Sequence, residues 1–407
     1  MKNIKAEILS PAGDLERLKA AVDYGADAVY LAGKEFGMRA SPLNFNDDDL
    51  IKAIKYSHDR NAKVYLTCNT LPRNDEIKRL PAFIEKVKDF GVDAFIVADI
   101  GVFNLVKKYA KDVDIHISTQ MGIVNYETAR AFYEMGAKRV VLARELPFED
   151  IFEIREKTDK NLEIEAFVHG SMCVSFSGRC LLSNYLTKRD ANRGDCAQPC
   201  RWKYNLVEEN REGKYFPIEE DSKGTYILNS RDLCMIDHID KILKSGITSL
   251  KIEGRAKSSY YVAVTTNAYK MALLDYYKMG KNWKLNPLLK EELEKISHRE
   301  YNTGFYFKDE PGQVYENGGY IRKYDVVAVC DGYNEENKMI EISQKNKFLK
   351  GDVLDILQPG DMPFNLEVKE IFDEWGNKVD QAPHAMQKLF IPCSKAIKVG
   401  SFFRRKR

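Results

Sequence analysis

A strand-then-helix pattern repeats along residues 6–255 of this 407-residue chain. Each unit begins with a short β-branched or apolar run that ends in small or polar residues, and an amphipathic helical stretch follows it. Apolar strands that alternate with helices are typical of a parallel sheet covered by helices. The eight runs lie at residues 6–14, 27–33, 62–70, 93–101, 114–122, 138–145, 163–170 and 248–255. Eight such units predict a (β/α)8 barrel, the TIM-type fold.

An open, doubly wound sheet is the alternative arrangement for such a pattern. A dinucleotide-binding sheet of that kind carries a G-x-G-x-x-G turn after its first strand, and this sequence has none there. Several helical stretches, among them residues 15–25 and 128–136, end in Gly, as a chain that turns back into a strand requires. We therefore expect the closed barrel.

The spacing of the runs is interrupted once, between the seventh and the eighth. We predict that residues 171–245 form a Cys-rich insertion there, within a barrel domain of residues 1–300. An insertion that follows a strand lies at the C-terminal rim of a barrel, where the active sites of this fold are found. From residue 310 onward the chain changes to short alternating strands with Gly, Asn and Pro in the turns, which predicts a small C-terminal all-β barrel domain at residues 310–407.

The C-terminal domain has basic and aromatic residues close together. Residues 345–350 read KNKFLK, and the sequence ends with Phe402 and Phe403 before four basic residues. Such side chains suit RNA phosphates and unstacked bases, whereas the alternative is a solvated strand and a frayed tail. Because the formal net charge of the chain is only +2, an RNA site would have to be a local patch.

The composition predicts a cytoplasmic protein without a membrane-spanning segment. The first residues lack the apolar core of a signal peptide, and no uninterrupted apolar run is long enough to cross a bilayer. The sequence has no H-E-x-x-H, G-x-S-x-G or G-x-x-x-x-G-K-[ST] motif, and no C-x3-C-x2-C motif of the kind that binds a cluster with S-adenosylmethionine. It therefore gives no support to a zinc protease, a serine hydrolase, a P-loop enzyme or a radical enzyme of that type.

Five of the eight cysteines lie in the predicted insertion, at Cys173, Cys180, Cys196, Cys200 and Cys234. Cytosolic thiols stay reduced, so such a group more often binds a metal or an iron–sulfur cluster than forms disulfides. The spacing lacks the two close pairs of a zinc ribbon and favours a cluster over zinc. The alternative is a set of buried structural thiols. Five thiols compete for about four ligand positions, so the spacing alone leaves Cys200 and Cys234 both open as ligands.

Polar side chains follow most of the predicted strands, at the end that forms the mouth of a barrel. They are Asp14, Asn69, Asp99, Gln120, Arg144, Glu145, Glu165, His169, Lys251, Glu253 and Arg255. Cationic members of this set can bind a small carboxylate substrate, and Arg can do so bidentately. For each single residue the alternative is an ion pair or a satisfied polar group within the barrel.

We assign candidate roles to eight residues of this set. His169 lies four residues before Cys173, where it would be a proton donor or a neighbour of the metal centre. Glu165, His169 and Glu253 are the candidate catalytic residues, and Asn69, Gln120, Arg144, Lys251 and Arg255 are the candidate substrate-binding residues.

Six ordered blocks of the sequence resemble the collagenase-like peptidase family, numbered U32. The most specific block is E-x-F-x2-G-S-M-C-x4-G-x-C-x-L-S, from Glu165 to Ser183. The others read LSPAGD, NRGDCAQPCR, NSRDLC, SLKIEGR and HREYNTGFYF, so the resemblance covers nearly the whole chain.

The resemblance implies a hydroxylation protein with a [4Fe–4S] cluster, despite the peptidase name of the family. A barrel followed by one small β domain is most similar to the branch that makes 5-hydroxyuridine at wobble position 34 of tRNA, with prephenate as a dicarboxylate cosubstrate. Cys173, Cys180, Cys196 and Cys234 would bind the cluster, with Cys200 as the alternative fourth ligand, and Arg144, Lys251 and Arg255 would meet prephenate. The alternatives are a peptidase of undefined mechanism, a hydroxylation protein for another RNA or a quinone precursor, and a non-enzymatic RNA-binding protein.

Overall fold

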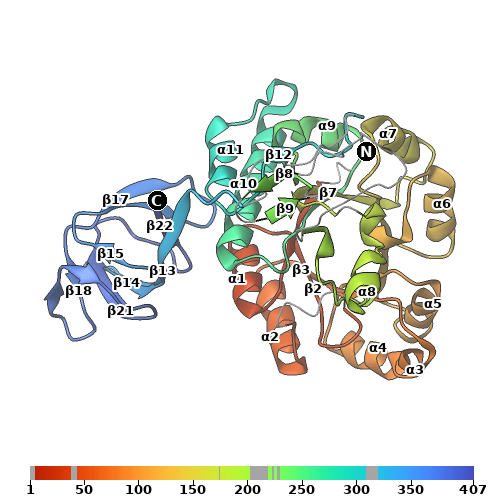
Figure 1. Cartoon of the computed structure of the whole chain (residues 1–407), viewed down its shortest axis with the longest axis horizontal. Coiled ribbons are helices and arrows are strands. Elements are labelled where there is room, and N and C mark those ends of the chain that lie inside the picture. Colours follow the sequence, from red (N-terminus) through yellow and green to blue (C-terminus); the bar gives the residue numbers. More distant parts are fainter. Residues whose placement is uncertain are drawn as a thin grey trace.

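The computed structural model describes residues 5–37, 44–173, 175–201, 219–221, 224–226, 230–308 and 320–407. Figure 1 shows a large part, in which helices surround a group of strands, and a smaller part made of strands that carries the C-terminus. The predicted fold class, a TIM-type barrel followed by an all-β domain, is confirmed.

The barrel is closed by parallel pairing of neighbouring strands. Its strands are β1 (Glu7–Pro11), β2 (Ala28–Leu31), β3 (Lys63–Cys68), β4 (Ala94–Val97), β5 (Asp114–Ile117), β6 (Arg139–Val141), β7 (Glu163–Ser171) and β11 (Ser249–Ile252). Each strand from β1 to β7 pairs with the next, and β11 pairs with both β7 and β1, which completes the ring. The predicted runs therefore correspond to the observed strands.

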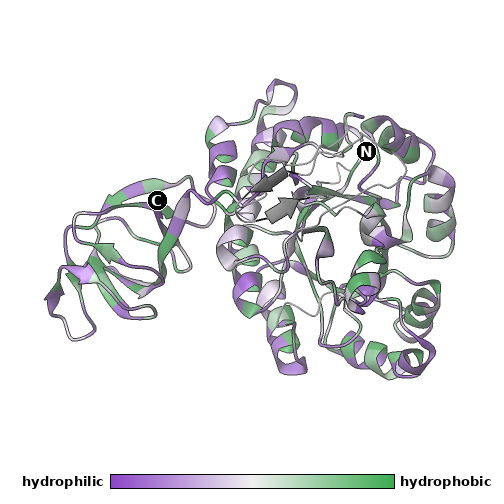
Figure 2. Ribbon diagram, viewed as in Figure 1, coloured by the Kyte–Doolittle hydropathy of each residue, from purple (hydrophilic) through white to green (hydrophobic). Residues whose placement is uncertain are grey.

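Helices cover the outside of the ring, as expected for parallel strands buried on both faces. They are α1 (Leu15–Asp23), α2 (Asp47–His58), α3 (Asn74–Ile77), α4 (Leu80–Asp89), α5 (Ile100–Tyr109), α6 (Tyr126–Glu134), α7 (Phe148–Glu156), α9 (Ile239–Lys244), α10 (Ser259–Met279) and α11 (Pro287–Glu294). Figure 2 shows that these helices carry both hydrophobic and hydrophilic residues. In the parts of the chain that the structure describes, none of the helices combines the length and the apolar character that crossing a bilayer requires.

The ends of the helices follow from the local sequence. Asp14 and Asp99 are the N-caps of α1 and α5, and each side chain accepts a hydrogen bond from a backbone N–H of the first turn. These two residues of the predicted mouth set are thus occupied in helix capping. Gly25 and Gly136 follow α1 and α6 with φ of 100° and 106°, a backbone conformation that glycine adopts without strain, so the chain can turn back into the next strand.

The Cys-rich insertion contains short elements. These are the 3₁₀ turns η2 (Phe176–Gly178), η3 (Ala191–Arg193) and η4 (Pro199–Arg201), the helix α8 (Leu182–Thr187), and the strands β8 (Glu219–Asp221) and β9 (Gly224–Tyr226). After them, β10 (Asp232–Cys234) pairs antiparallel with the end of β7, and β12 (Tyr301–Asn302) pairs with β10. The segment around residue 300 therefore belongs to the barrel sheet.

The C-terminal domain is an antiparallel all-β unit with its own core. Its main sheet has the order β17-β16-β22-β13-β14-β21-β18-β19, and β15 and β20 form a separate pair. The strands are β13 (Tyr324–Asn334), β14 (Met339–Gln344), β15 (Phe348–Leu349), β16 (Val353–Leu357), β17 (Phe364–Glu367), β18 (Ile371–Phe372), β19 (Lys378–Val379), β20 (Gln381–Ala382), β21 (Lys388–Pro392) and β22 (Phe402–Lys406).

The basic and aromatic C-terminal segment is a structural strand, so the alternative of a frayed tail is wrong. Phe402 and Phe403 are buried, and Arg404 is fully buried between the domains. The Arg404 guanidinium lies 2.6 Å from a Glu292 oxygen of α11 and 2.8 Å from an Asp355 oxygen of β16. A charge so enclosed is paired with its carboxylate partners and is not available to RNA.

Candidate active site

We call the end of the barrel at which its strands begin the closed end. A buried ion network lies there around Arg139, the first residue of β6. Its guanidinium contacts the carboxylates of Glu7, Glu163 and Glu165 at 2.5, 2.5 and 3.0 Å. Lys251 in β11 is 2.7 Å from the other oxygen of Glu165. Burial alone would raise the pKa of Glu165, but the charges of Lys251 and Arg139 outweigh it and lower that pKa.

Glu165 and Lys251 therefore lie deeper than the sequence analysis expected. Glu165 is the third residue of the nine-residue strand β7, so its placement at the C-terminal end of that strand was wrong. Its side chain has no exposed surface, and Lys251 is 5% exposed. Both charges are directed at each other inside the barrel. This ion pair links the two residues to the closed-end network.

The mouth of the barrel brings together four of the predicted residues that follow strands. Asn69 donates a hydrogen bond to Gln120 Oε1 at 2.8 Å, which joins the loop after β3 to the turn η1 (Thr119–Met121) after β5. Arg144 Nη1 donates to the backbone oxygen of Ser171 at 3.3 Å, and its Nη2 lies 3.7 Å from Glu253 Oε2. These contacts connect the end of β3 with that of β5, and the end of β6 with those of β7 and β11.

Arg144 is held over the mouth mainly by packing. Its guanidinium carbon lies 3.9 Å from the centroid of the Phe167 ring, a distance at which cation and ring attract one another. The Glu253 carboxylate at 3.7 Å is beyond hydrogen-bond distance, and the buried Arg144 Nε has no hydrogen-bond partner in the described structure. This cation is therefore positioned but incompletely neutralised.

Arg255 is the second arginine of the mouth and is 3% exposed. It donates hydrogen bonds to Thr67 Oγ1 at 3.3 Å and to Asn44 Oδ1 at 2.8 Å. Tyr30 contributes a hydroxyl 3.4 Å from Glu253 Oε2. Sequence reasoning missed Tyr30, Asn44 and Thr67 at this site. Tyr30 and Thr67 lie near the ends of β2 and β3, which was the available signal.

Gly170 lies in the sequence block that begins at Glu165. It has a φ of 113°, and a Cβ atom on it would lie 2.4 Å from the backbone oxygen of Glu253. Only a residue without a side chain lets β7 pass this close to the loop that carries Glu253. The glycine thereby fixes where the Glu253 carboxylate stands.

His169 is enclosed rather than exposed at the mouth. Its ring lies 5.9, 5.5 and 5.4 Å from the rings of Tyr261, Tyr269 and Tyr301, and the residue is 1% exposed. Burial lowers the pKa of His169 to about 3, so the imidazole is neutral near pH 7. An enclosed, neutral ring is poorly placed to give a proton to a substrate in the mouth.

The insertion is attached to the rim of the mouth. The backbone N–H and the hydroxyl of Ser177 both donate to Glu145, each at 2.7 Å, and Arg179 contacts Met121 Sδ at 3.8 Å. Arg193 forms an ion pair with Glu76 at 2.6 Å, beside the loop after β3. The cysteines of the insertion are therefore carried on a segment that lies against the active end of the barrel.

The five cysteines differ in exposure. Cys173 and Cys196 are exposed, Cys180 and Cys200 are half-buried, and Cys234 is buried. The Tyr269 hydroxyl lies 3.9 Å from the Cys234 sulfur, and burial raises the pKa of that thiol to about 11. Thiolate sulfur is the donor that an iron–sulfur cluster requires. Within the described ranges, however, no three His, Cys, Asp or Glu side chains form a group that would hold a metal ion.

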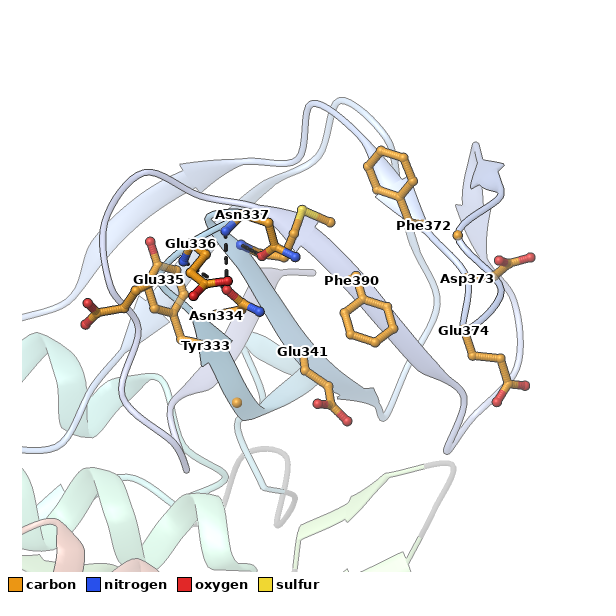
Figure 3. A pocket seen from close by; sticks show the side chains of 13 residues that line it. Tyr333, Asn334, Glu335, Glu336, Asn337, Glu341, Phe372, Asp373, Glu374 and Phe390 are labelled. Atoms are coloured by element: carbon orange, nitrogen blue, oxygen red, sulfur yellow. Dashed lines mark hydrogen bonds between the residues drawn. The ribbon is translucent and has the colours of Figure 1, made fainter.

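The C-terminal domain has an acidic hollow of about 750 Å³, shown in Figure 3. Glu341 and Phe390 project from its strands, and Asp373 and Glu374 stand on the facing loop. Glu335 and Glu336 also line it. Of the KNKFLK segment, Phe348 is buried in the core of the domain. Because carboxylates repel phosphates, this hollow does not favour the expected RNA contact.

The sequence matches one family along nearly its whole length. The sequence model of peptidase family U32 matches residues 13–315, and that of the peptidase family U32 C-terminal domain matches residues 322–404. The chain is 37% identical over 404 residues to tRNA hydroxylation protein P1 of Bacillus subtilis (strain 168), covering 98% of this chain and 95% of that protein. It is 36% identical over 439 residues to tRNA hydroxylation protein P of Escherichia coli (strain K12), covering 97% and 95%.

A third relative is named for a different RNA. The 23S rRNA 5-hydroxycytidine C2501 synthase of Escherichia coli (strain K12) is 35% identical over 269 residues, which cover 66% of this chain and 39% of that protein.

Proposed function

The chain belongs to peptidase family U32, and we propose that it hydroxylates RNA, with uridine 34 of tRNA as substrate and 5-hydroxyuridine as product. Two relatives that match nearly the full length are named tRNA hydroxylation proteins. A third is named as a synthase of 5-hydroxycytidine in 23S rRNA. The structural observation that carries the proposal is the convergence of Arg144, Glu253 and Tyr30 at the mouth, beside Arg255.

The mouth is suited to a small dicarboxylate beside a base. Arg144 and Arg255 both place guanidinium groups at the mouth, and a planar guanidinium can bind a carboxylate bidentately. We propose that they hold prephenate, and that the amides of Asn69 and Gln120 contact the pyrimidine. Glu253, 9% exposed and close to the Tyr30 hydroxyl, is the group placed to accept or return a proton.

We propose in addition that Cys173, Cys180, Cys196 and Cys234 bind a [4Fe–4S] cluster. The sulfur donors, their uneven spacing and the attachment of the insertion to the rim support this. When bound, such a cluster supplies electron transfer or a Lewis-acidic iron. Cys200 is the alternative to Cys234, because it lies close to Cys196 in the sequence and is half-buried, whereas Cys234 is buried beside Tyr269.

The pKa values of Cys234 and His169 argue against a cysteine-peptidase mechanism at this pair. The two residues face each other across the antiparallel pair of β10 and β7. A nucleophilic thiol needs a lowered pKa and a base that can become charged. Here burial raises the pKa of Cys234 to about 11 and lowers the pKa of His169 to about 3. These shifts favour the neutral forms of both groups, so the pair is not a thiolate–imidazolium dyad of the kind that a cysteine peptidase uses.

The proposed reaction is tested by mass spectrometry of tRNA nucleosides. A strain that lacks the gene should lose 5-hydroxyuridine, and wild-type protein supplied from a plasmid should restore it. Glu253→Gln should not restore it, because the amide cannot accept the proton. Exposed Glu367→Gln in β17 serves as the matched control and should restore it fully. An unchanged 5-hydroxyuridine level in the deletion strain would refute the reaction.

The cluster is tested by iron and sulfide analysis of protein purified without oxygen. Cys180→Ser should lose iron together with the broad absorption near ~400 nm of iron–thiolate sites. Comparing Cys234→Ser with Cys200→Ser identifies the fourth ligand, because only the ligand variant should lose the cluster. Cys330→Ser, in the buried core of the C-terminal domain, is the control. Wild-type iron content in Cys180→Ser excludes the proposed ligand set.

A further inference from the structure

The insertion presents large apolar side chains to solvent at the rim of the barrel. Phe176, Leu181, Tyr185 and Leu186 are 51%, 76%, 85% and 43% exposed, and we call these four residues the α8 face. Phe176 lies in η2, Leu181 is the N-cap of α8, and Tyr185 and Leu186 lie within α8. Single exposed apolar residues are ordinary, but a group of them in one short segment marks an interaction site.

The α8 face has a fixed direction because the opposite side of the helix is anchored. Ser183 is fully buried, donates to the Arg189 backbone oxygen at 2.8 Å, and accepts from the Ala197 N–H at 3.0 Å. Tyr185 N–H donates to the Leu181 oxygen at 2.9 Å, so these two side chains lie one helical turn apart on the same side. The exposed aromatic ring therefore belongs to an ordered surface.

Basic side chains border the α8 face. Arg179, Lys188 and Arg189 are exposed, and Arg189 forms an ion pair with Asp195 at 2.8 Å. Across the described ranges, no carboxylate lies within ion-pair distance of Arg179 or Lys188. The α8 face also borders the mouth, because the Phe176 ring packs beside Gly122 and Arg179 contacts Met121, both at the turn after β5.

We propose that the α8 face is the docking surface for the single-stranded loop of the RNA substrate. Unstacked bases lie on Tyr185 and Phe176, and Arg179 and Lys188 meet the adjoining phosphates. Aromatic faces combined with unneutralised cations are the chemistry by which proteins hold single-stranded RNA. The choice of a tRNA anticodon loop rests on the proposed function, whereas the preference for unpaired RNA rests on the α8 face itself.

Stacking is tested by the affinity of the full-length protein for a labelled anticodon stem–loop. Tyr185→Ala should weaken binding by about tenfold, within the 5- to 150-fold range that corresponds to roughly 1–3 kcal/mol for one stacked base. Tyr185→Trp should bind like the wild type, because it keeps an aromatic face. Trp375→Ala removes an aromatic side chain that is 75% exposed in the C-terminal domain and should have no effect.

The phosphate contacts are tested by the salt dependence of the same binding. Lys188→Ala should lower the slope of log affinity against log salt by roughly 0.7, the value for one phosphate contact on a single strand. Lys111→Ala is the matched control, since Lys111 is exposed in the loop before β5, at the opposite end of the barrel. A blunt duplex of the same length should bind more weakly than the stem–loop.

Two outcomes would overturn the docking surface: undiminished stem–loop binding by Tyr185→Ala, or a protein dimer that Tyr185→Ala converts to a monomer without changing RNA binding. The reaction and the docking surface can fail separately. Tyr185-dependent binding in a protein whose gene does not affect 5-hydroxyuridine supports the surface and refutes the reaction. If deletion of the gene removes 5-hydroxyuridine but Tyr185→Ala binds the stem–loop like the wild type, the reaction is supported and the docking surface is refuted.

Discussion

Arg139 and Arg144 are five positions apart in the sequence and differ in how their charges are balanced. Arg139, at the closed end, contacts three carboxylates within 3.0 Å and is 3% exposed. Arg144, at the mouth, packs on Phe167 and has its carboxylate neighbour, Glu253, at 3.7 Å. The comparison separates a charge that the fold has already neutralised from one that can still take an anion.

The difference follows from the direction of the strands. Glu7, Glu163 and Arg139 stand at the beginnings of β1, β7 and β6, so a closed parallel barrel brings them to one end. A buried ion network of this kind requires all its members, because removing one leaves the others desolvated and unpaired. At the mouth, an incoming anion can supply the missing partner.

The largest effect is expected from Arg139→Met, which leaves Glu7, Glu163 and Glu165 without their common cation. Removing one partner of a buried network typically costs about 3–5 kcal/mol of unfolding free energy. Denaturant unfolding followed by circular dichroism measures it. Arg130→Met, which breaks an exposed ion pair with Glu127 on α6, should cost less than about 1 kcal/mol. Equal losses in the two variants would show that the network is not a structural requirement.

A smaller effect, on binding rather than on stability, is expected from Arg144→Met. The methionine keeps the packing on Phe167 but removes the charge. The unfolding free energy should fall less than in Arg139→Met, because Arg144 has one carboxylate neighbour at 3.7 Å whereas Arg139 has three within 3.0 Å. Binding of prephenate, measured by calorimetry, should weaken by roughly 10- to 150-fold, the equivalent of losing charge-assisted hydrogen bonds worth about 1.5–3 kcal/mol. If the affinity for prephenate is unchanged and the free energy of unfolding falls, Arg144, like Arg139, stabilises the fold and does not bind the substrate.

The barrel itself could be predicted because its signal is local. Each run of apolar residues and each helix-ending glycine lies within one unit, and strand ends such as Arg144 and Glu253 were placed at the mouth from that pattern alone. The Arg139 network could not be predicted in the same way, because Glu7 and Arg139 are far apart in the sequence and meet only when β11 closes the ring.

The C-terminal segment shows the same limit in another form. A run of two aromatic and four basic residues has the same sequence pattern in a solvated tail and in a central strand, so the pattern does not distinguish the two. The remote carboxylates of Glu292 and Asp355 determine the outcome, because they enclose Arg404 between the domains. The cysteines are a similar case. Their spacing in the sequence identifies candidate sulfur ligands, but it does not reveal that Cys234 is buried beside Tyr269.

The closed end also predicts a pH dependence of stability through His116 of β5. Its ring packs against Tyr65 at 4.6 Å, and burial, followed by the charges of Arg139 and Lys251, lowers the pKa of His116 well below its usual value. Below about pH 6.5 the unfolded chain therefore takes up a proton that the folded chain does not. The free energy of unfolding consequently decreases as the pH is lowered. His116→Phe should remove up to about 1.4 kcal/mol per pH unit from that slope.

This dependence is measured by unfolding between about pH 7 and about pH 5, the range in which the unfolded imidazole becomes charged. His384→Gln removes an exposed histidine of the C-terminal domain and serves as the control for the lost titratable group. An identical slope in wild type and His116→Phe would mean that the folded barrel accommodates a charged imidazole beside Arg139.

The smallest effect is expected from Asn69→Leu, which removes a neutral donor from the mouth. Asn69 donates to Gln120 at 2.8 Å, and one neutral hydrogen bond is worth about 0.5–1.5 kcal/mol, so kcat/KM for tRNA should fall by roughly 2- to 12-fold. Asn161→Leu, in an exposed loop at the opposite end, should leave it unchanged. Because Asn69 carries no charge, its loss should act on the RNA and leave prephenate affinity intact, the reverse of Arg144→Met. A loss of prephenate affinity in Asn69→Leu would instead mean that the amide pair and the arginines form one anion site.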